Sequence, residues 1–348
     1  MTTAIESDPC AHSTVLPNTS RHRETEARLP PAIKGLLASL ILVDASDASV
    51  STIHDTSRFL PMTSTDNTRL AVTYQIIQSG ATALDEGCCE KALVTLRIAL
   101  KLLEQSSDKS GGDIATCQTL VGRCYVALGE DQQALDWFEL ALPRHTTWDG
   151  PCSQSVSAAH VDHGTALLGL GRYDEATQHF KRAVRIDEAT LGVNNPTTAR
   201  RRANLGVGYF KMGQLSSAIR CYSQSMAVIR THLGDHHPEM AAKWNNIGLA
   251  WKAMGEANMA HSAFENALTV DLNTQPPNYV ALATTRYNLG ITCLSQNQIS
   301  DAFDHLSSSY QMRHQCLGAT HPHTTDAAIA LSLVQIVKSQ NTPLSMPS

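Results

Sequence analysis

The sequence has few charged and few aromatic side chains for its length. Charged residues make up 17% of the 348 positions, and Phe, Trp and Tyr together make up 5%. Acids outnumber bases, with a formal net charge of −5, so the chain lacks the basic surface that nucleic-acid binders carry. The scarce aromatic residues provide no evident stacking platform for bases. We therefore expect no nucleic-acid partner.

Motifs for catalysis, phosphate binding and metal binding are also missing. No Gly-Lys-Ser or Gly-Lys-Thr occurs, and the glycine clusters do not follow a strand pattern. Nine cysteines form no Cys-x-x-Cys pair, and their spacing supplies no set of four zinc ligands. No nucleophile stands beside a base that a third group orients. We predict a non-enzymatic protein with no catalytic residue, cofactor or metal.

Secretory and membrane signals are absent as well. The N-terminus lacks a basic region followed by an apolar core, which a signal peptide requires. The apolar stretch at residues 33–43 is shorter than the roughly 20 residues that span a bilayer. An odd number of cysteines without framework spacing is typical of reduced, packed thiols. These features predict a cytoplasmic protein without an integral membrane segment.

What the sequence does contain is a repeat of 42 residues. Three columns follow it: a glycine column, a second turn-glycine column seven residues later that ends in Asn297, and an alanine column twelve residues after the first glycine. The first column is Gly80, Gly122, Gly164, Gly206, Gly248 and Gly290, and the alanine column is Ala92, Ala134, Ala176, Ala218, Ala260 and Ala302. A fixed period of this size predicts stacked structural repeats, which present an extended surface for binding.

Each repeat reads as two helices joined by a tight turn. In the fourth unit, residues 199–212 carry apolar side chains at helical spacing, and Gly213 follows the last turn, where a left-handed residue ends a helix. Residues 215–229 form a second helical pattern. The small side chains of Gly206 and Ala218 let the two helices approach closely. Gly248→Leu should therefore overpack the matching site of the fifth unit.

This pattern resembles the tetratricopeptide repeat, and within that family the 42-residue repeats of kinesin light chains. The likeness rests on the period, on first helices such as Trp-Asn245-Asn246-Ile-Gly, and on connections such as Leu233-Gly-Asp-His-His-Pro238. The resemblance implies an all-α, right-handed α-solenoid of about six helix-turn-helix units with a C-terminal capping helix. Residues 67–338 should form this superhelix, with connections at residues 106–112 and 143–155 flanking the second unit. No heptad pattern precedes the repeats, so association with kinesin does not follow.

Two segments fall outside the repeats. Residues 1–66 are rich in Ser, Thr, Asp and Pro, and we expect them to be mostly disordered apart from a short apolar helix near residues 33–43. That helix could cap the first repeat, which we favour, dock into the protein's own groove, or contact a partner or membrane surface. Residues 339–348 are expected to be a flexible tail.

The resemblance places the binding site in a concave groove lined by the first helix of each unit. The candidates for peptide binding are Asp162, Arg200, Asn204, Lys211, Asn245, Asn246, Leu249, Lys252, Tyr287, Asn288 and Ile291. Amides can bond a peptide backbone, and lysine or arginine can meet its carboxylates. Alternatively, these asparagines bridge neighbouring repeats.

The functional prediction is a scaffold that holds a protein or peptide partner in its groove. The alternative is an accessory or regulatory subunit of an enzyme complex. His160 and His163 lie on adjacent turns of one predicted helix, but a metal site would need further ligands from a neighbouring helix. We interpret them as ordinary helix histidines.

Overall fold

The computed structural model describes residues 66–105 and 111–341 as helices and short connections, with no strand in these ranges. The predicted apolar helix at 33–43, almost all of the predicted disordered segment and the last seven residues of the predicted tail lie outside the described residues. None of the described helices is long and apolar enough to cross a bilayer. The eight described cysteines are free thiols.

Two compact units contain the described helices. The smaller unit has α3 (Asp66–Asp85) and α4 (Cys89–Glu104). The larger unit comprises α5 (Gly111–Ala127), α6 (Asp131–Asp149), α7 (Gln154–Gly169), α8 (Tyr173–Thr190), α9 (Pro196–Lys211), α10 (Leu215–Leu233), α11 (Pro238–Ala253), α12 (Ala257–Asn273), α13 (Tyr279–Ser295), α14 (Ile299–Leu317) and α15 (Pro322–Asn341).

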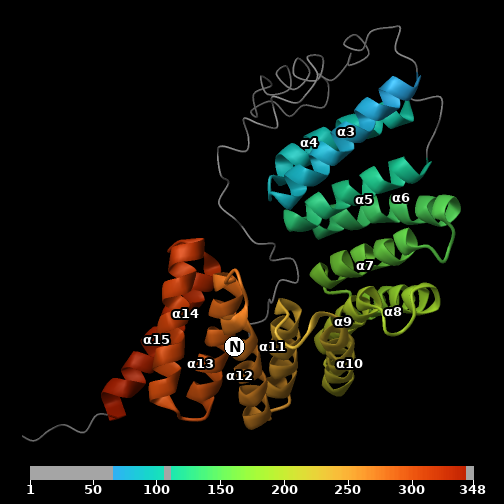
Figure 1. Cartoon of the computed structure of the whole chain (residues 1–348). Coiled ribbons are helices and arrows are strands. Elements are labelled where there is room, and N and C mark those ends of the chain that lie inside the picture. Colours follow the sequence, from blue (N-terminus) through green and yellow to red (C-terminus); the bar gives the residue numbers. More distant parts are fainter. Residues whose placement is uncertain (1–65, 106–110, 342–348) are drawn as a thin grey trace, which may run out of the picture. The chain divides into compact units, whose positions relative to one another are not determined.

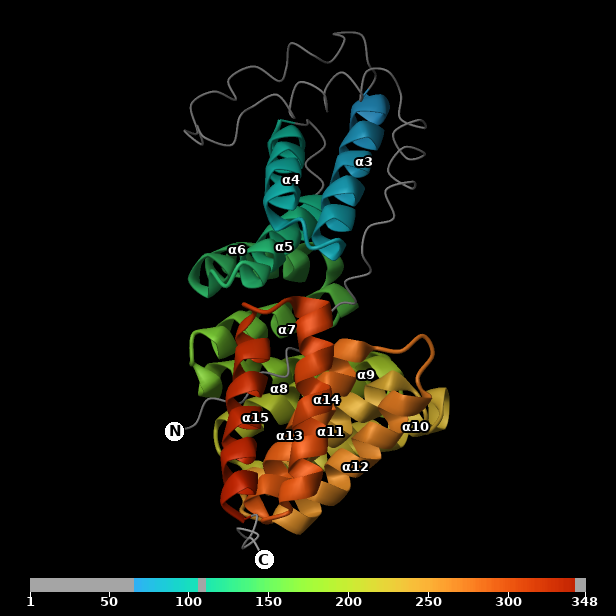
Figure 2. The same ribbon diagram turned by 90° about the vertical axis from the view of Figure 1, so that its left-hand side faces the viewer.

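Within the larger unit, the helices stack in chain order (Figure 1). Each packs on the next, and α5, α7, α9, α11, α13 and α15 also contact one another in succession. We call these six the first helices, and α6, α8, α10, α12 and α14 the second helices. Figure 2 shows α13, α14 and α15 side by side at the C-terminal end. The all-α repeat fold predicted from the sequence is confirmed.

The glycine column marks the closest approach of the two helices of each repeat. A Cβ added to Gly248 would lie 2.5 Å from Cε1 of Phe264, sixteen residues later in the second helix. Phe138, Phe180 and Tyr222 stand in the same way over Gly122, Gly164 and Gly206. The absent side chain thus makes room for an aromatic ring that the same repeat supplies, as close packing requires.

The alanine column and a Ser–Ala pair complete the contact between paired helices. The six column alanines have no exposed surface. In the fourth unit, Ser225 of α10 donates a 2.6 Å hydrogen bond to the Ala199 carbonyl of α9. The third unit reverses the arrangement, because Ser157 of the first helix donates to the Ala183 carbonyl of the second at 3.2 Å. The serine hydroxyl can therefore come from either helix of a repeat, and it bonds a backbone carbonyl of the other helix.

Turns between paired helices require a left-handed residue. Gly213 has φ +74°, and Asn297, which replaces glycine in the sixth unit, has φ 60°. Asparagine tolerates this region better than other residues with a side chain. The turn column of the sequence is therefore explained by backbone geometry.

Each predicted connection beside the second unit, at residues 106–112 and 143–155, includes residues that are helical in the structure. Helix α6 continues through Pro143 to Asp149, although proline removes one backbone donor inside the helix. Helix α5 begins at Gly111, within the stretch expected to be a connection. Cβ atoms added to Gly111 and Gly112 would lie 2.8 and 2.9 Å from the Trp148 ring. The extended α6 places Trp148 over the start of α5, and glycine there leaves room for the ring.

From α7 onward, the first helices begin with a proline or a side-chain cap. Asn195 accepts a bond from the Thr197 amide before α9, and His237 does the same for the Glu239 amide before α11 through Nδ1. His321 accepts from the His323 amide at the start of α15. The His-Pro connections predicted from the sequence thus act as helix caps, which satisfy amides left unpaired in the first turn.

His237→Ala should destabilise α11, because it removes an acceptor that the first turn needs. The expected loss is about 0.5–2 kcal/mol in the free energy of unfolding, measured by chemical denaturation. His237→Asn is the matched control, since Asn195 caps α9 at the same repeat position. If both variants lose the same stability, the imidazole acceptor does not cap the helix.

Candidate functional site

Two of the predicted groove residues form ion pairs between successive first helices. The Arg123 guanidinium of α5 donates to both carboxylate oxygens of Asp162 on α7, at 3.0 and 2.9 Å. Arg200 of α9 donates to Glu239 of α11, and Lys243 contacts the other oxygen of Glu239 at 3.1 Å. These charges hold adjacent repeats together, so we exclude Asp162 and Arg200 from the proposed contact with a partner.

Asn245 and Asn288 lie in a buried polar network rather than on an open surface. The Asn288 amide donates to the Asn245 carbonyl oxygen at 3.2 Å, and the Asn245 amide donates to the Thr285 hydroxyl at 2.7 Å. Thr285 in turn donates to the Asp271 carboxylate at 2.7 Å. The alternative reading of these two asparagines, that they bridge repeats, matches this geometry. Their peptide contact, which the sequence suggested, is not retained.

The remaining candidates stay at least partly exposed on the first helices. They are Asn204 and Lys211 of α9, Asn246, Leu249 and Lys252 of α11, and Tyr287 and Ile291 of α13. Lys252 is half-buried, and burial lowers the pKa of its ammonium group. It forms no ion pair with any residue that the structure describes. A cation held in this way gains stability from an added negative charge.

Tyr287 stands out among these because of its neighbour. The Arg313 guanidinium of α14 lies 4.5 Å from the centre of the Tyr287 ring, within range of a cation–π interaction. Arg313 is buried, and its Nη1 also donates to the His323 carbonyl at 2.8 Å. Burial raises the pKa of the Tyr287 hydroxyl, so it stays protonated at neutral pH. Tyr287 is thus held in place by α14 and is a fixed part of the surface.

The sequence analysis did not identify the exposed apolar face of α15. Ile329, Leu333 and Ile336 are 57, 53 and 54% exposed on this last helix. Counting in steps of 42 residues, they continue three rows whose members in α13 are Tyr287, Ile291 and Leu294 and in α11 are Asn245, Leu249 and Lys252. These residues could have been found from the sequence by extending the 42-residue period beyond Gly290, the last glycine of the column. Together with the remaining candidates, these residues form a surface that we call the first-helix surface: Asn204, Lys211, Asn246, Leu249, Lys252, Tyr287, Ile291, Leu294, Ile329, Leu333 and Ile336.

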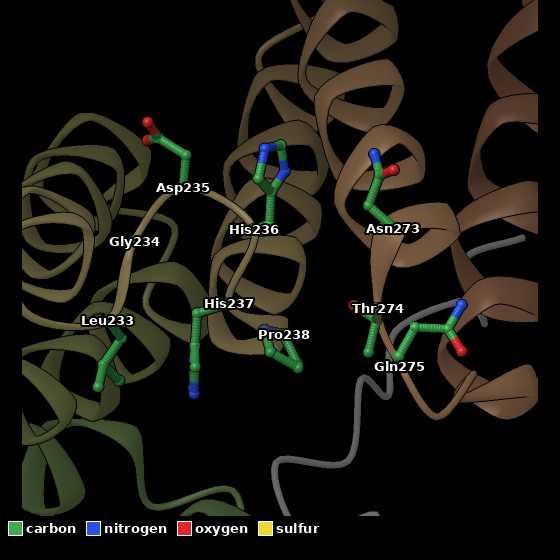
Figure 3. A pocket seen from close by; sticks show the side chains of 9 residues that line it. All are labelled: Leu233, Gly234, Asp235, His236, His237, Pro238, Asn273, Thr274 and Gln275. Carbon is green, nitrogen blue, oxygen red and sulfur yellow. The ribbon is translucent and has the colours of Figure 1, made fainter.

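A cavity of about 360 Å³ lies elsewhere, at the edge formed by the connections. It is lined by residues 233–238 on one side and by residues 273–275 after α12 on the other (Figure 3). Three of its polar side chains already have local partners: Asp235 pairs with Arg230, His237 caps α11, and Thr274 donates to the Val270 carbonyl. We therefore do not assign it a ligand.

Metal binding finds no support in the described ranges. No group of three or more His, Cys, Asp or Glu side chains there has a geometry that could hold an ion. His160 and His163 are nevertheless joined by a third histidine that the sequence did not single out, His179 of α8.

Part of the chain matches the model of a known protein family. The tetratricopeptide repeat model matches residues 155–231 and 239–315, which cover α7 to α14. The chain contains tetratricopeptide repeats. A search of curated protein sequences gave no match for it.

Solved structures share the fold of this chain at low sequence identity. BtubC (BKLC) from P. vanneervenii is 15% identical, with a TM-score of 0.53 over 74% of this chain and 94% of its own. A putative kinesin light chain with nearly identical repeats from Podosopora anserina is 19% identical, with 0.51 over 60% and 98%. A signal transduction ATPase with a tetratricopeptide repeat sensor from Pyrococcus horikoshii is 13% identical, with 0.59 over 78% and 40%. At these identities the likeness concerns the fold alone.

Proposed function

We propose that this protein is a non-enzymatic scaffold that binds a segment of a protein partner on its first-helix surface. The repeat fold supports this role, because tetratricopeptide repeats generally act as interaction modules without catalysis. The observation that carries the proposal is the exposed apolar set on α15, Ile329, Leu333 and Ile336. These three half-exposed aliphatic side chains lie three and four residues apart, on one face of α15, and contiguous exposed apolar patches of this kind mark interaction sites.

The charge on the same surface defines the partner more closely. Lys252 precedes Leu294 and Ile336 in one row across α11, α13 and α15. Lys211 of α9 also forms no ion pair with a described residue. A partner segment with large apolar side chains and a carboxylate would fit this surface. Its apolar side chains would be buried against α13 and α15, and its carboxylate would lie beside Lys252. Such a pairing would offset the unfavourable burial of the lysine.

The test compares two double variants of matched chemistry. Lys252→Glu with Leu333→Asp changes the first-helix surface, whereas Arg220→Glu with Met259→Asp makes the same changes at exposed positions of α10 and α12. Partners captured by the wild type are identified by mass spectrometry, and the affinity of each purified partner is then measured. We expect the first variant to bind at least about tenfold more weakly, a loss of roughly 1.4 kcal/mol.

Unchanged helical content by circular dichroism shows that both variants remain folded. Loss of binding in the α10 and α12 variant, with binding retained in the first, would place the partner on the second helices and refute the proposal. A single stoichiometric enzyme among the captured proteins would instead identify the partner class as catalytic and the scaffold as its accessory subunit.

A further inference from the structure

Three histidine rings meet inside the third repeat. His160 and His163 come from α7, and His179 comes from α8. Nδ1 of His160 lies 3.1 Å from Nδ1 of His179, and the rings of His163 and His179 stack with centres 4.9 Å apart and planes 9° apart. His160 and His163 are buried, and His179 is partly buried. The two helices of this repeat therefore pack through titratable groups.

Other repeats fill the same position with apolar side chains. His163 precedes its repeat glycine by one residue, and that place is taken by Val121, Leu205, Ile247 and Leu289 in the second, fourth, fifth and sixth units. All four of those side chains are buried. The third unit thus has an ionisable ring where the repeat pattern uses aliphatic packing. An aliphatic residue at position 163 is compatible with the fold, which provides a natural replacement for a test.

The contact between His160 and His179 requires that at least one of the two imidazoles be neutral. One of the two facing Nδ1 atoms of His160 and His179 must donate and the other must accept, so the pair shares a single proton. His163 donates from Nδ1 to the Ala159 carbonyl at 3.1 Å. A proton added to each ring would set two N–H groups against each other and stack two like charges. Both changes favour separation of α7 from α8.

The surrounding charges do not neutralise a protonated cluster. Glu139 of α6 and Asp162 of α7 favour the charged form of His163, and Glu175 favours that of His179. Asp162 is already paired with Arg123 of α5, and Glu175 with Arg172. Arg182 of α8 opposes protonation of both His160 and His179. From α9, the guanidinium groups Arg201 and Arg202 pair with Asp187 and Glu188 of α8.

Burial is the main cause of the resulting shifts. With smaller contributions from Arg182 and His163, it lowers the pKa of His160 to about 4. Burial, together with His163, His160 and Arg182, lowers the pKa of His179 to about 3, and burial also lowers the pKa of His163. The unfolded chain therefore binds more protons than the folded repeat once the pH falls below about 6.5. Stability from the neutral cluster is present above that pH and is lost progressively as the pH falls toward 4.

We propose that the third repeat is an acid-sensitive joint, in which α7 and α8 separate at mildly acidic pH while the repeats on its C-terminal side remain folded. Repeat arrays allow this because their stability is a sum of unit and nearest-neighbour terms. The sixth repeat has one partly buried histidine whose pKa burial lowers, His305, whereas the third repeat has three histidines with lowered pKa values. The third repeat should therefore open first.

Hydrogen exchange on the full chain, with correction for the intrinsic exchange rate at each pH, tests the proposal. Between pH 7 and pH 5, linkage raises the opening equilibrium by roughly 20-fold for each histidine whose pKa falls from 6.5 to 4 or below. We expect amides of α7 and α8 to lose protection by more than 100-fold over this range. Amides of α11 and α12 should change by much less.

His160→Gln with His163→Leu is the diagnostic variant, since Gln118 and Leu205 occupy these positions in other repeats. It should reduce the loss of α7–α8 protection on acidification at least tenfold. His236→Gln, an exposed histidine in the connection before α11, is the control and should change nothing. The exchange profile of the wild type decides the matter even if the variant does not fold. Uniform loss of protection along the larger unit, or the same pH dependence in variant and wild type, would overturn the proposal.

Discussion

Gly248→Leu is expected to lower the free energy of unfolding by about 3 kcal/mol, at the upper end of the cost of overpacking a core. Even the first carbon of the new side chain would lie 2.5 Å from Phe264, whose own side chain has no exposed surface. The α11 and α12 backbones must then move apart, because the fully buried ring has no open space into which it can shift. Chemical denaturation followed by circular dichroism measures the loss.

Two further variants separate overpacking from helix propensity. Ser262→Ala changes an exposed position of α12 and should leave stability within about 0.5 kcal/mol. Phe264→Leu should recover part of the stability of the Gly248→Leu protein, because it removes the ring that the new side chain meets. Equal stability of the wild type and the Gly248→Leu variant would show that the glycine column does not mark a close helix approach.

Glu239→Ala should be the most damaging loss of charge. Glu239 accepts bonds from Arg200 of α9 at 2.7 Å and contacts Lys243 of α11 at 3.1 Å, and only 7% of the Lys243 side chain is exposed. Removing the carboxylate leaves a buried ammonium without a counter-charge. Breaking a fully buried pair costs roughly 3–5 kcal/mol, and we expect about 2–4 kcal/mol here because Glu239 is a quarter exposed.

The pH dependence identifies the cause of that loss. Burial already lowers the pKa of Lys243, and without Glu239 the pKa should fall further. The penalty should then shrink as the pH rises and the lysine becomes neutral. Glu175→Ala is the control, since the Arg172–Glu175 pair is exposed and should contribute no measurable stability. A Glu239→Ala protein with wild-type stability at neutral pH would mean that Lys243 finds water or another partner at no cost.

Packing within a repeat could be predicted from the sequence, because it depends on residues at fixed local spacing. Four of the six column glycines face an aromatic ring sixteen residues later and the other two face a leucine, and in each case both residues lie within one pair of helices. Turn positions could be predicted for the same reason, down to the left-handed Asn297. The connection predicted to begin at Pro143 was wrong because α6 tolerates a proline in its interior. The lost backbone hydrogen bond is outweighed by the packing of that helix, including Trp148 over α5.

Contacts between repeats were harder to predict, since they join residues about 40 positions apart. Asn246 and Asn245 are neighbours in sequence, yet Asn245 is buried against Thr285 and Asn288 whereas Asn246 remains partly exposed. Only the offset between α11 and α13 decides which amide faces inward. His179 was missed for a different reason: its contact with His160 lies within one repeat, but no column of the repeat pattern marks it.

Site-specific photo-crosslinking tests the central claim, that the partner contacts the first-helix surface, most directly. A photoreactive phenylalanine analogue replaces Leu333 of α15 in one protein and Met259 of α12 in another, two aliphatic or thioether side chains of similar exposure. The same partner should form a crosslinked product with the position-333 protein and not with the position-259 protein. A crosslink from position 259, with none from position 333, would contradict it.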